Sequence, residues 1–307
     1  MGGTTSTTDR LELGSLTLSL DVAFARAEAS HAVDPSQHEP HLDVGDQPAS
    51  HTVVSWMNGF QLGASFGLGN RVGLDLALPF RVSVLEATFT DHHNAELDID
   101  SIHHHDETVA GIGDLELGAR FGLVRPMDVR GLTLDLRIGL SFPTGHVEPD
   151  PYALGDQGQW HRHTFFGQGT FVPQVGLDLD FATPGGSVTL SADGQISFYE
   201  GPGGYEPPSF GTFGLGFRSG FGLETVRFTI AQILYSESES FWAGTAAENS
   251  GRTDLAVDLR VGADLGAGLS LGALIRATYF SATNGGTFES PFLLGLSLGW
   301  TIDTLPD

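Results

Sequence analysis

The feature that most constrains the fold is an alternation of apolar and polar residues that recurs along nearly the whole chain. In the segment 131–143, apolar side chains occupy every second position, at Leu132, Leu134, Leu136, Ile138, Leu140 and Phe142. Successive side chains of a strand point to opposite faces, so a period of two predicts a strand with one apolar face. The same pattern predicts twelve strands, at 14–28, 52–68, 71–89, 112–124, 131–143, 171–182, 187–199, 209–223, 225–236, 253–265, 269–281 and 291–302.

The connections between these strands alternate in length. Short turns are expected at 69–70, 125–130, 183–186, 224 and 266–268, and long connections at 29–51, 90–111, 144–170, 200–208, 237–252 and 282–290. Alternating short turns and long loops are typical of outer-membrane barrels, with both termini on the periplasmic side. A soluble β-sandwich also alternates apolar with polar residues, so the period alone leaves both folds open.

Three further features favour the barrel. The polar faces of the predicted strands carry mainly Gly, Ser, Thr and Ala, whereas a solvated sheet usually carries long charged side chains. Each apolar face has five or six consecutive positions, which suits the ~9–11 residues of a tilted membrane strand. Aromatic residues lie near strand ends, as an interfacial girdle requires, at Trp56, Phe80, Phe121, Phe142, Phe181, Phe198, Phe221, Tyr279 and Trp300. The predicted fold is all-β, a single antiparallel up-and-down transmembrane β-barrel of about twelve strands, with a periplasmic tail at 1–13 and the barrel at 14–303.

Composition limits the partners and the location. The chain has a net charge of −24, with fourteen basic residues that are all Arg. Such an acidic surface repels nucleic acid and attracts cations. Cysteine is absent, which excludes disulfides and thiolate metal sites. The first residues have neither a basic nor an apolar signal region, so we expect the export signal to be missing from this chain and the barrel to lie in the bacterial outer membrane.

All twelve histidines fall in the first 163 residues, within the first three predicted long connections. Counting strands predicts that these three connections lie at the same external end of the barrel. The candidate metal ligands there are His31, His38, His41, Asp43, His51, His92, His93, His103, His104, His105, Asp106, Glu107, His146, His161 and His163. Imidazole and carboxylate donors suit Zn, Cu or Ni. Because no spacing matches a specific metal motif, a pH-responsive gate and a simple solvated loop remain alternatives.

The polar faces of the strands also carry charges that we expect to line the lumen. The candidate lumen residues are Asp75, Arg81, Asp114, Glu116, Arg120, Asp135, Arg137, Asp178, Asp180, Arg218, Arg227, Asp258, Arg260, Asp264 and Arg276. Arg and carboxylate on neighbouring strands predict ion-pair networks. These networks either rigidify the barrel or form a polar path that selects the solute. Twelve strands enclose more space than the ~8 that side chains can fill, so a narrow or partly plugged pore is expected.

Three glycine-containing segments resemble a known group of outer-membrane barrels. They are Gly111-Ile-Gly113-Asp114, then Pro143-Thr144-Gly145, and then Gly167-Gln168-Gly169 followed by Pro173. In this order they are similar to the "transporter" barrels of the phenol-degradation meta-pathway family, and the resemblance covers about 110–181. It implies a small outer-membrane barrel that passes small molecules, often aromatic compounds. The histidine-rich connections are not part of that pattern.

No catalytic constellation is present, so we expect a protein that is not an enzyme and requires no cofactor. The sequence predicts an outer-membrane channel or uptake barrel for a small solute, whose histidine-rich external loops capture a divalent transition metal such as Zn, Cu or Ni. One alternative is passive diffusion of small organic compounds with incidental histidines. Another is a closed structural or interaction barrel. The expected partners are outer-membrane lipid and a small solute or metal ion, without nucleic acid.

Overall fold

The computed structural model describes residues 12–33, 42, 47–99 and 101–304, and most of these residues belong to one antiparallel sheet. The wall strands are β1 (Ser15–Ala32), β2 (Ser50–Gly67), β3 (Val72–Thr90), β5 (Glu107–Ile112), β6 (Leu115–Val124), β7 (Leu132–Phe142), β8 (Val172–Thr183), β9 (Gly186–Gln195), β11 (Phe210–Ser219), β12 (Val226–Glu237), β15 (Arg252–Gly266), β16 (Leu269–Thr283) and β17 (Thr287–Asp303). Both β5 and β6 pair with β3, so they are consecutive pieces of one wall strand.

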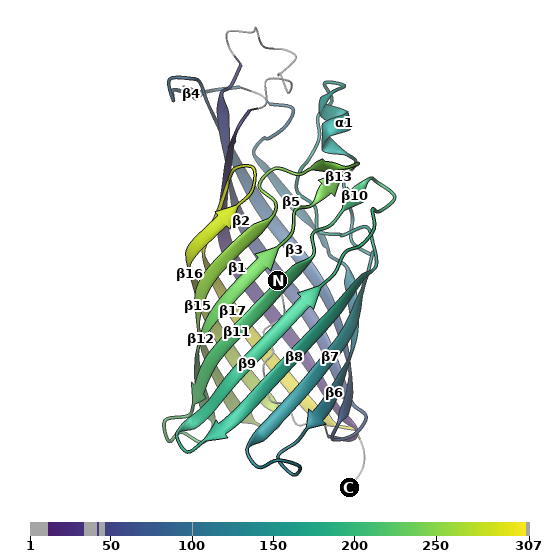
Figure 1. Ribbon diagram of the computed structural model, residues 1–307, viewed down its shortest axis with the longest axis vertical. Helices are drawn as coiled ribbons and strands as arrows, with labels where there is room; N and C mark the ends of the chain where they lie inside the picture. Colours follow the sequence, from purple (N-terminus) through teal and green to yellow (C-terminus); the bar gives the residue numbers. More distant parts are fainter. Residues whose placement is uncertain (1–11, 34–41, 43–46, 100, 305–307) are drawn as a thin grey trace.

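The sheet closes on itself as an up-and-down barrel (Figure 1). Each wall strand pairs antiparallel with its neighbours along the chain, and the first strand pairs with the last, from Ser15 opposite Asp303 to Ser30 opposite Thr287. With β5 and β6 counted as one strand, the wall has the twelve strands that the alternation predicts. The predicted fold class, a closed all-β antiparallel barrel, is confirmed.

The outer face of the barrel is apolar. Leucine and isoleucine side chains in the middle of the strands remain open to the surroundings, with exposed fractions of 59% for Leu62, 52% for Ile138 and 61% for Leu296. The residues between them point inward, and Asp258 is fully buried there. An apolar surface of this extent marks contact with a membrane or partner. Around a closed barrel it is the band that faces lipid.

The first three strands are longer than a membrane requires. β1 and β2 have 18 residues each and β3 has 19, whereas a tilted membrane strand needs ~9–11 residues. Their upper ends rise above the rest of the wall in Figure 1. The ends of β1 and β2 that carry His31 and His51 therefore lie outside the bilayer. The expectation that both histidines lie in loops is wrong, because β1 and β2 continue pairing out to Ala32 and Ser50.

The long connections and the remaining small elements gather at this external end (Figure 1). The small elements are β4 (Glu96–Leu97), β10 (Tyr205–Glu206), β13 (Phe241–Trp242), β14 (Thr245–Ala246) and the helix α1 (Pro151–Gly155). Asp150 caps α1 by accepting hydrogen bonds from the backbone N–H groups of Tyr152 and Ala153. Among the described residues, no helix is long and apolar enough to cross a membrane.

Several strand boundaries differ from the sequence prediction; for example, the strands expected at 187–199 and 209–223 end at Gln195 and Ser219. The connection expected at 282–290 shrinks to 284–286, because β16 and β17 extend toward each other. The fourth wall strand begins at Glu107 and is interrupted at 113–114, between β5 and β6. The interruption lies opposite Pro79, which has no backbone N–H to donate; there the N–H of Gly113 donates to the Pro79 carbonyl at 2.8 Å and that of Leu115 donates to the Thr144 hydroxyl at 2.9 Å. Asp114, expected within a continuous strand, therefore lies in a break of the wall.

Candidate metal centre

Six of the predicted histidines converge at the external mouth of the barrel. They come from the ends of β1 and β2, from the 91–106 connection and from the 143–171 connection. Their rings form two groups in which the potential ligand atoms lie within 4.8 Å of one another. We call His31, His51 and His104 triad A, and His103, His161 and His163 triad B. The two triads are neighbours, because the ring centroids of His104 and His163 are 4.6 Å apart.

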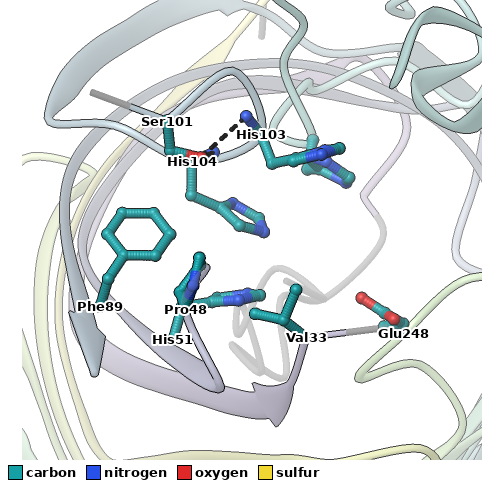
Figure 2. Close-up of a pocket in the computed structure, with 9 residues that line it drawn as sticks. Val33, Pro48, His51, Phe89, Ser101, His103, His104 and Glu248 are labelled. Carbon is teal, nitrogen blue, oxygen red and sulfur yellow. Dashed lines mark hydrogen bonds between the residues drawn. The ribbon is translucent and has the colours of Figure 1, made fainter. Parts of the chain in front are cut away.

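Strand register builds the first half of triad A. His31 of β1 is paired directly opposite His51 of β2, and residues opposite each other in an antiparallel pair have neighbouring Cβ atoms. Their ring centroids are 4.0 Å apart, and His104 from the 91–106 connection adds a third ring 4.3 Å from that of His51. Figure 2 shows His51 and His104 beside the small cavity that they share with Phe89 and Pro48.

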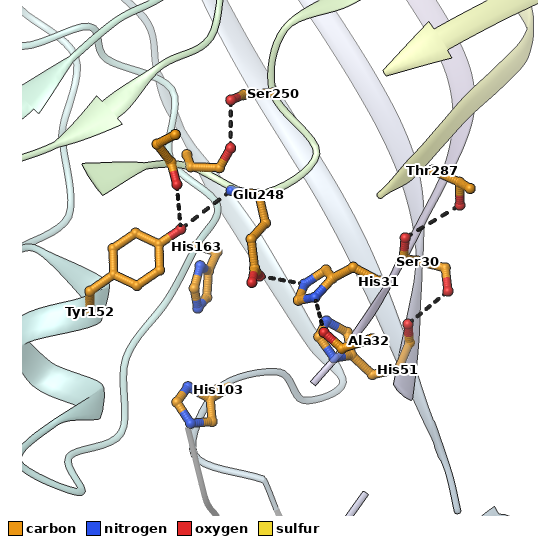
Figure 3. A network of polar contacts seen from close by, with 12 residues as sticks. Ser30, His31, Ala32, His51, His103, Tyr152, His163, Glu248, Ser250 and Thr287 are labelled. Carbon is orange, nitrogen blue, oxygen red and sulfur yellow. Dashed lines mark hydrogen bonds and ion pairs between the residues drawn. The ribbon is translucent and has the colours of Figure 1, made fainter. Parts of the chain in front are cut away.

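A carboxylate completes the surroundings of triad A. Glu248, in the connection that follows β14, places Oε2 2.6 Å from Nε2 of His31 (Figure 3). The backbone N–H of Glu248 donates to the Tyr152 hydroxyl at 3.3 Å, and that hydroxyl donates to the carbonyl of Ala246 at 3.4 Å. Tyr152 belongs to α1, so the glutamate is positioned by two external connections at once.

Triad B has the nitrogen spacing of a ligand set. Nε2 of His161 lies 3.2 Å from Nδ1 of His103 and 3.1 Å from Nε2 of His163. Nitrogens bound to one tetrahedral zinc at ~2.0–2.1 Å would lie about 3.3 Å apart. Nδ1 of His161 is 2.9 Å from the carbonyl oxygen of Gln159, which can only accept a hydrogen. In the neutral ring, Nε2 therefore carries the lone pair and points at the other two nitrogens.

Burial keeps the central imidazoles of triad A in the form that binds metal. Burial, with smaller effects of nearby His31 and His103, lowers the pKa of His51 to about 3. Burial also lowers the pKa of His104 well below its ordinary value. For His31, burial lowers the pKa, but the hydrogen bonds to Glu248 and to the Ala32 carbonyl outweigh it, so the pKa is raised. At neutral pH, His51 and His104 carry unprotonated ring nitrogens.

Two polar contacts fix the rest of the 103–107 and 161–163 segments. His105 stacks on Trp160 with ring centroids 4.6 Å apart and places Nε2 3.5 Å from Glu107. Arg162, between the two histidines of triad B, points the other way and pairs with Glu107 at 2.6 Å. This alternation leaves His161 and His163 on the same side of their segment, as the sequence predicts.

The other predicted ligands lie apart from the triads. His92 and His93 are exposed beside a turn that Asp91 closes by accepting from the backbone N–H groups of His93 and Ala95. His146 is exposed and lies 3.5 Å from Glu148, and Asp106 accepts from the backbone N–H of Ala87. His38, His41 and Asp43 fall outside the described residues.

Sequence reasoning missed three residues of this centre. Glu248 and Tyr152 sit in connections where a single carboxylate or phenol carries no signal. Gly155, the last residue of α1, packs against triad B, since a Cβ there would lie 3.0 Å from Cε1 of His103 and 3.3 Å from Cε1 of His161. The small size of this glycine is its only signal, and glycine is common throughout the chain.

The 143–171 connection is fastened to the break in the wall. The carboxylate of Asp114 accepts hydrogen bonds from the backbone N–H groups of Gly145 and Gln168, both at 2.8 Å. A Cβ on Gly145 would lie 2.6 Å from the Cα of Gly167, and one on Gly167 would lie 2.4 Å from the carbonyl oxygen of Gly145. Glycine is required at both positions because the two ends of the connection touch backbone to backbone. The three glycine motifs of the sequence thus meet at one carboxylate.

Inside the barrel, most of the predicted charged residues form ion pairs, some between neighbouring strands, some between strands two apart and one within a single strand. The pairs are Arg120 with Asp75 at 3.1 Å, Arg125 with Asp135 at 2.7 Å, Arg137 with Asp178 at 2.9 Å and with Asp193 at 2.7 Å, Arg218 with Asp180, and Asp258 with Arg260 and Arg276, each at 2.7 Å. Arg81 is near Glu116 and Asp114. Two of the predicted lumen residues instead stabilise turns: Arg227 donates to the carbonyls of Leu223 and Glu224, and Asp264 accepts from the backbone N–H of Gly266.

The fold is similar to that of known outer-membrane proteins. An outer-membrane channel from Pseudomonas putida F1 superimposes with a TM-score of 0.63 at 14% identity, covering 96% of this chain and 98% of that chain. The translocator domain of the autotransporter NalP from Neisseria meningitidis gives a TM-score of 0.45 at 11% identity, covering 93% and 88%. The P. putida toluene transporter TodX gives 0.41 at 8% identity, covering 95% and 90%.

The first of these likenesses, together with the apolar outer band, shows a barrel of the bacterial outer membrane. At this identity the likeness concerns the fold alone. No protein-family profile matches the sequence, and no curated protein matches it. The resemblance of the three glycine motifs to the phenol-degradation family is therefore not confirmed.

Proposed function

We propose that this protein is an outer-membrane channel that captures a divalent transition-metal ion at its external mouth and passes it inward. The observation that carries the proposal is the convergence of six imidazoles from four chain segments into two adjacent triads. Segments far apart in the sequence supply the same donor chemistry to one place. Histidines whose role is only to keep a loop hydrated would be expected to point into solvent and not to cluster with one another.

The chemistry of the donors favours zinc, copper or nickel. Imidazole nitrogen is the preferred donor of these ions, and Glu248 adds a carboxylate oxygen beside His31. The net charge of −24 raises the local concentration of cations around the mouth. Within the lumen, Arg137 is shared by Asp178 and Asp193, and Asp258 is shared by Arg260 and Arg276, so this part of the wall carries paired charges of both signs.

Metal binding is tested by calorimetric titration of zinc into the folded barrel in detergent. We expect micromolar or tighter binding by the native protein, and loss of most of it in the H104A/H163A variant, which removes one imidazole from each triad. The matched control is H92A/H93A, which removes two exposed histidines outside the triads and should bind zinc like the native protein. Equal binding by both variants would contradict the proposal.

Passage is tested with proteoliposomes that enclose a zinc-sensitive dye. The native barrel and H92A/H93A should admit zinc from low external concentrations, and H104A/H163A should admit it more slowly. Single-channel recordings provide the complementary measurement. Conductance without metal binding would favour a small organic solute as the cargo, and an absence of conductance would favour a closed structural barrel.

A further inference from the structure

The two triads differ in how completely the protein surrounds them, and this difference deepens the metal capture proposed above, on which it rests. Zinc-type sites with four protein ligands are closed and structural, whereas sites with three protein ligands keep a fourth position for water or an external ligand. The number of protein donors and the volume of open space beside each triad therefore indicate whether it would form a closed or an open site.

Triad A has a fourth protein donor and little space. Glu248 Oε2 lies 2.6 Å from His31 Nε2, so one ion held by His31, His51 and His104 could also be reached by that carboxylate. The cavity bordered by His51, His104 and Glu248, and also by His103 and His163 of triad B, has a volume of about 10 Å³. That is close to the minimum for a single water molecule, so an ion there would exclude further ligands.

Triad B has three donors and faces open space. Its nitrogens already have ligand spacing, at 3.1 and 3.2 Å. The neighbouring cavity has a volume of about 310 Å³ and is lined by all three histidines together with Tyr152, Asp156 and Glu248. Each triad has one buried histidine, His51 in triad A and His161 in triad B, but only triad B has an exposed one, His163. An ion at triad B would thus have one side open to the cavity.

The geometry points to two metal sites of different kinds: a closed site formed by triad A with Glu248, and an open site at triad B. The closed ion joins β1, β2, the 91–106 connection and the connection after β14, so it holds the mouth together. The open ion exchanges and carries water or a small anionic ligand in its fourth position. His103 and His104 are adjacent in sequence but serve different triads, which couples the two sites through one short segment.

Cobalt distinguishes the two sites, because its visible spectrum reports the ligands. We load the metal-free, folded barrel with Co²⁺ and expect two ions per chain. Azide should alter the spectrum of the triad B ion and leave that of the triad A ion unchanged. A chelator should remove the triad B ion in a fast phase and the triad A ion in a separate slow phase.

Variants assign each signal to its site. H161A should retain one cobalt that azide does not affect, while H51A should retain one that azide does affect. E248Q keeps the size of the side chain and should selectively make the slow cobalt azide-sensitive or labile, which covers the case in which H51A does not fold. H93A is the matched control and should behave like the native protein.

The outcomes separate the two proposals. Azide sensitivity of the ion retained in H161A, or resistance of the ion retained in H51A, would overturn the division into closed and open sites while leaving metal capture intact. Binding of no cobalt or zinc by the native barrel would overturn metal capture itself.

Discussion

Asp258 is fully buried in the lumen between two guanidinium groups. Arg276 contacts it through two nitrogens, at 2.7 and 3.0 Å, and Arg260 contacts it at 2.7 Å. Asp258 and Arg276 are opposite each other in the register of β15 and β16, and Arg260 follows two positions along β15 on the same face. The carboxylate supplies a counter-charge to two arginine side chains that are 26% and 24% exposed, so its contribution comes mainly from the positive charge that would otherwise be left unpaired.

The variant D258N tests this arrangement. It keeps the shape of the side chain but leaves two sheltered guanidinium groups without their carboxylate, which costs about 3–5 kcal/mol for a buried pair. Denaturant unfolding in detergent or lipid should show a loss of that size. D264N is the control, because Asp264 is exposed beside a turn. The side-chain oxygen of the asparagine introduced there can still accept the hydrogen bond from the backbone N–H of Gly266. A loss below about 1 kcal/mol in D258N would show that water reaches the group freely.

At the scale of elements, the strands within the membrane could be predicted from sequence and their external ends could not. Inside the bilayer the outer face must be apolar, so alternation reveals each strand. Above the bilayer that requirement ends, and in residues 28–32 both faces carry polar or small side chains while backbone pairing with β2 continues. The sequence pattern therefore predicts loops at His31 and His51, although both residues belong to paired strands.

The candidate centre shows the same division. Counting strands was sufficient to bring three histidine-bearing segments to one end, because that step needs only topology. The sorting into triads depends on register, on the break at Asp114 and on α1, none of which leaves a periodic signal. Glu248 was missed because one glutamate in a polar connection resembles any other.

The variant G167A tests the fastening of the 143–171 connection. Its new Cβ would lie 2.4 Å from the carbonyl oxygen of Gly145, so the two ends of the connection must separate. Overpacking of this kind costs about 1–3 kcal/mol. We expect faster hydrogen exchange and proteolysis within 146–166, and weaker metal binding at triad B. G203A is the control in the next external connection, where the nearest atom would be 3.9 Å away. Unchanged exchange in G167A would contradict the close approach.

At the scale of the whole molecule, the apolar residues form the outside and the charged residues form the inside. This inversion of a soluble protein is the consequence of a closed sheet, in which neighbouring strands satisfy one another's backbone groups and the outer side chains face lipid. The free-energy cost of a charge on the outer face then depends on how deep in the bilayer it lies. Arginine substitutions of two leucines, one inside and one outside the membrane-spanning strands, measure this cost.

The variant L296R places a charge in the middle of β17 on the lipid face, where Leu296 is 61% exposed. Arginine near the bilayer midplane costs about 2–4 kcal/mol in such barrels. L13R changes an equally exposed leucine, 66% exposed, that precedes β1 and lies outside the strands. Unfolding in lipid vesicles should show the loss only in L296R. Similar stability of the two variants would mean that the band does not face lipid.

The carboxylate of Asp114 has a consequence for chain entropy at the metal centre. By holding Gly145 and Gln168 together, it closes the segment that carries His161 and His163 before any ion arrives. Closing a free loop of this length costs on the order of 3 kcal/mol. Because the loop closes when the barrel folds, this entropy is lost during folding and not during metal binding. The ligands of triad B are therefore preorganised for an ion.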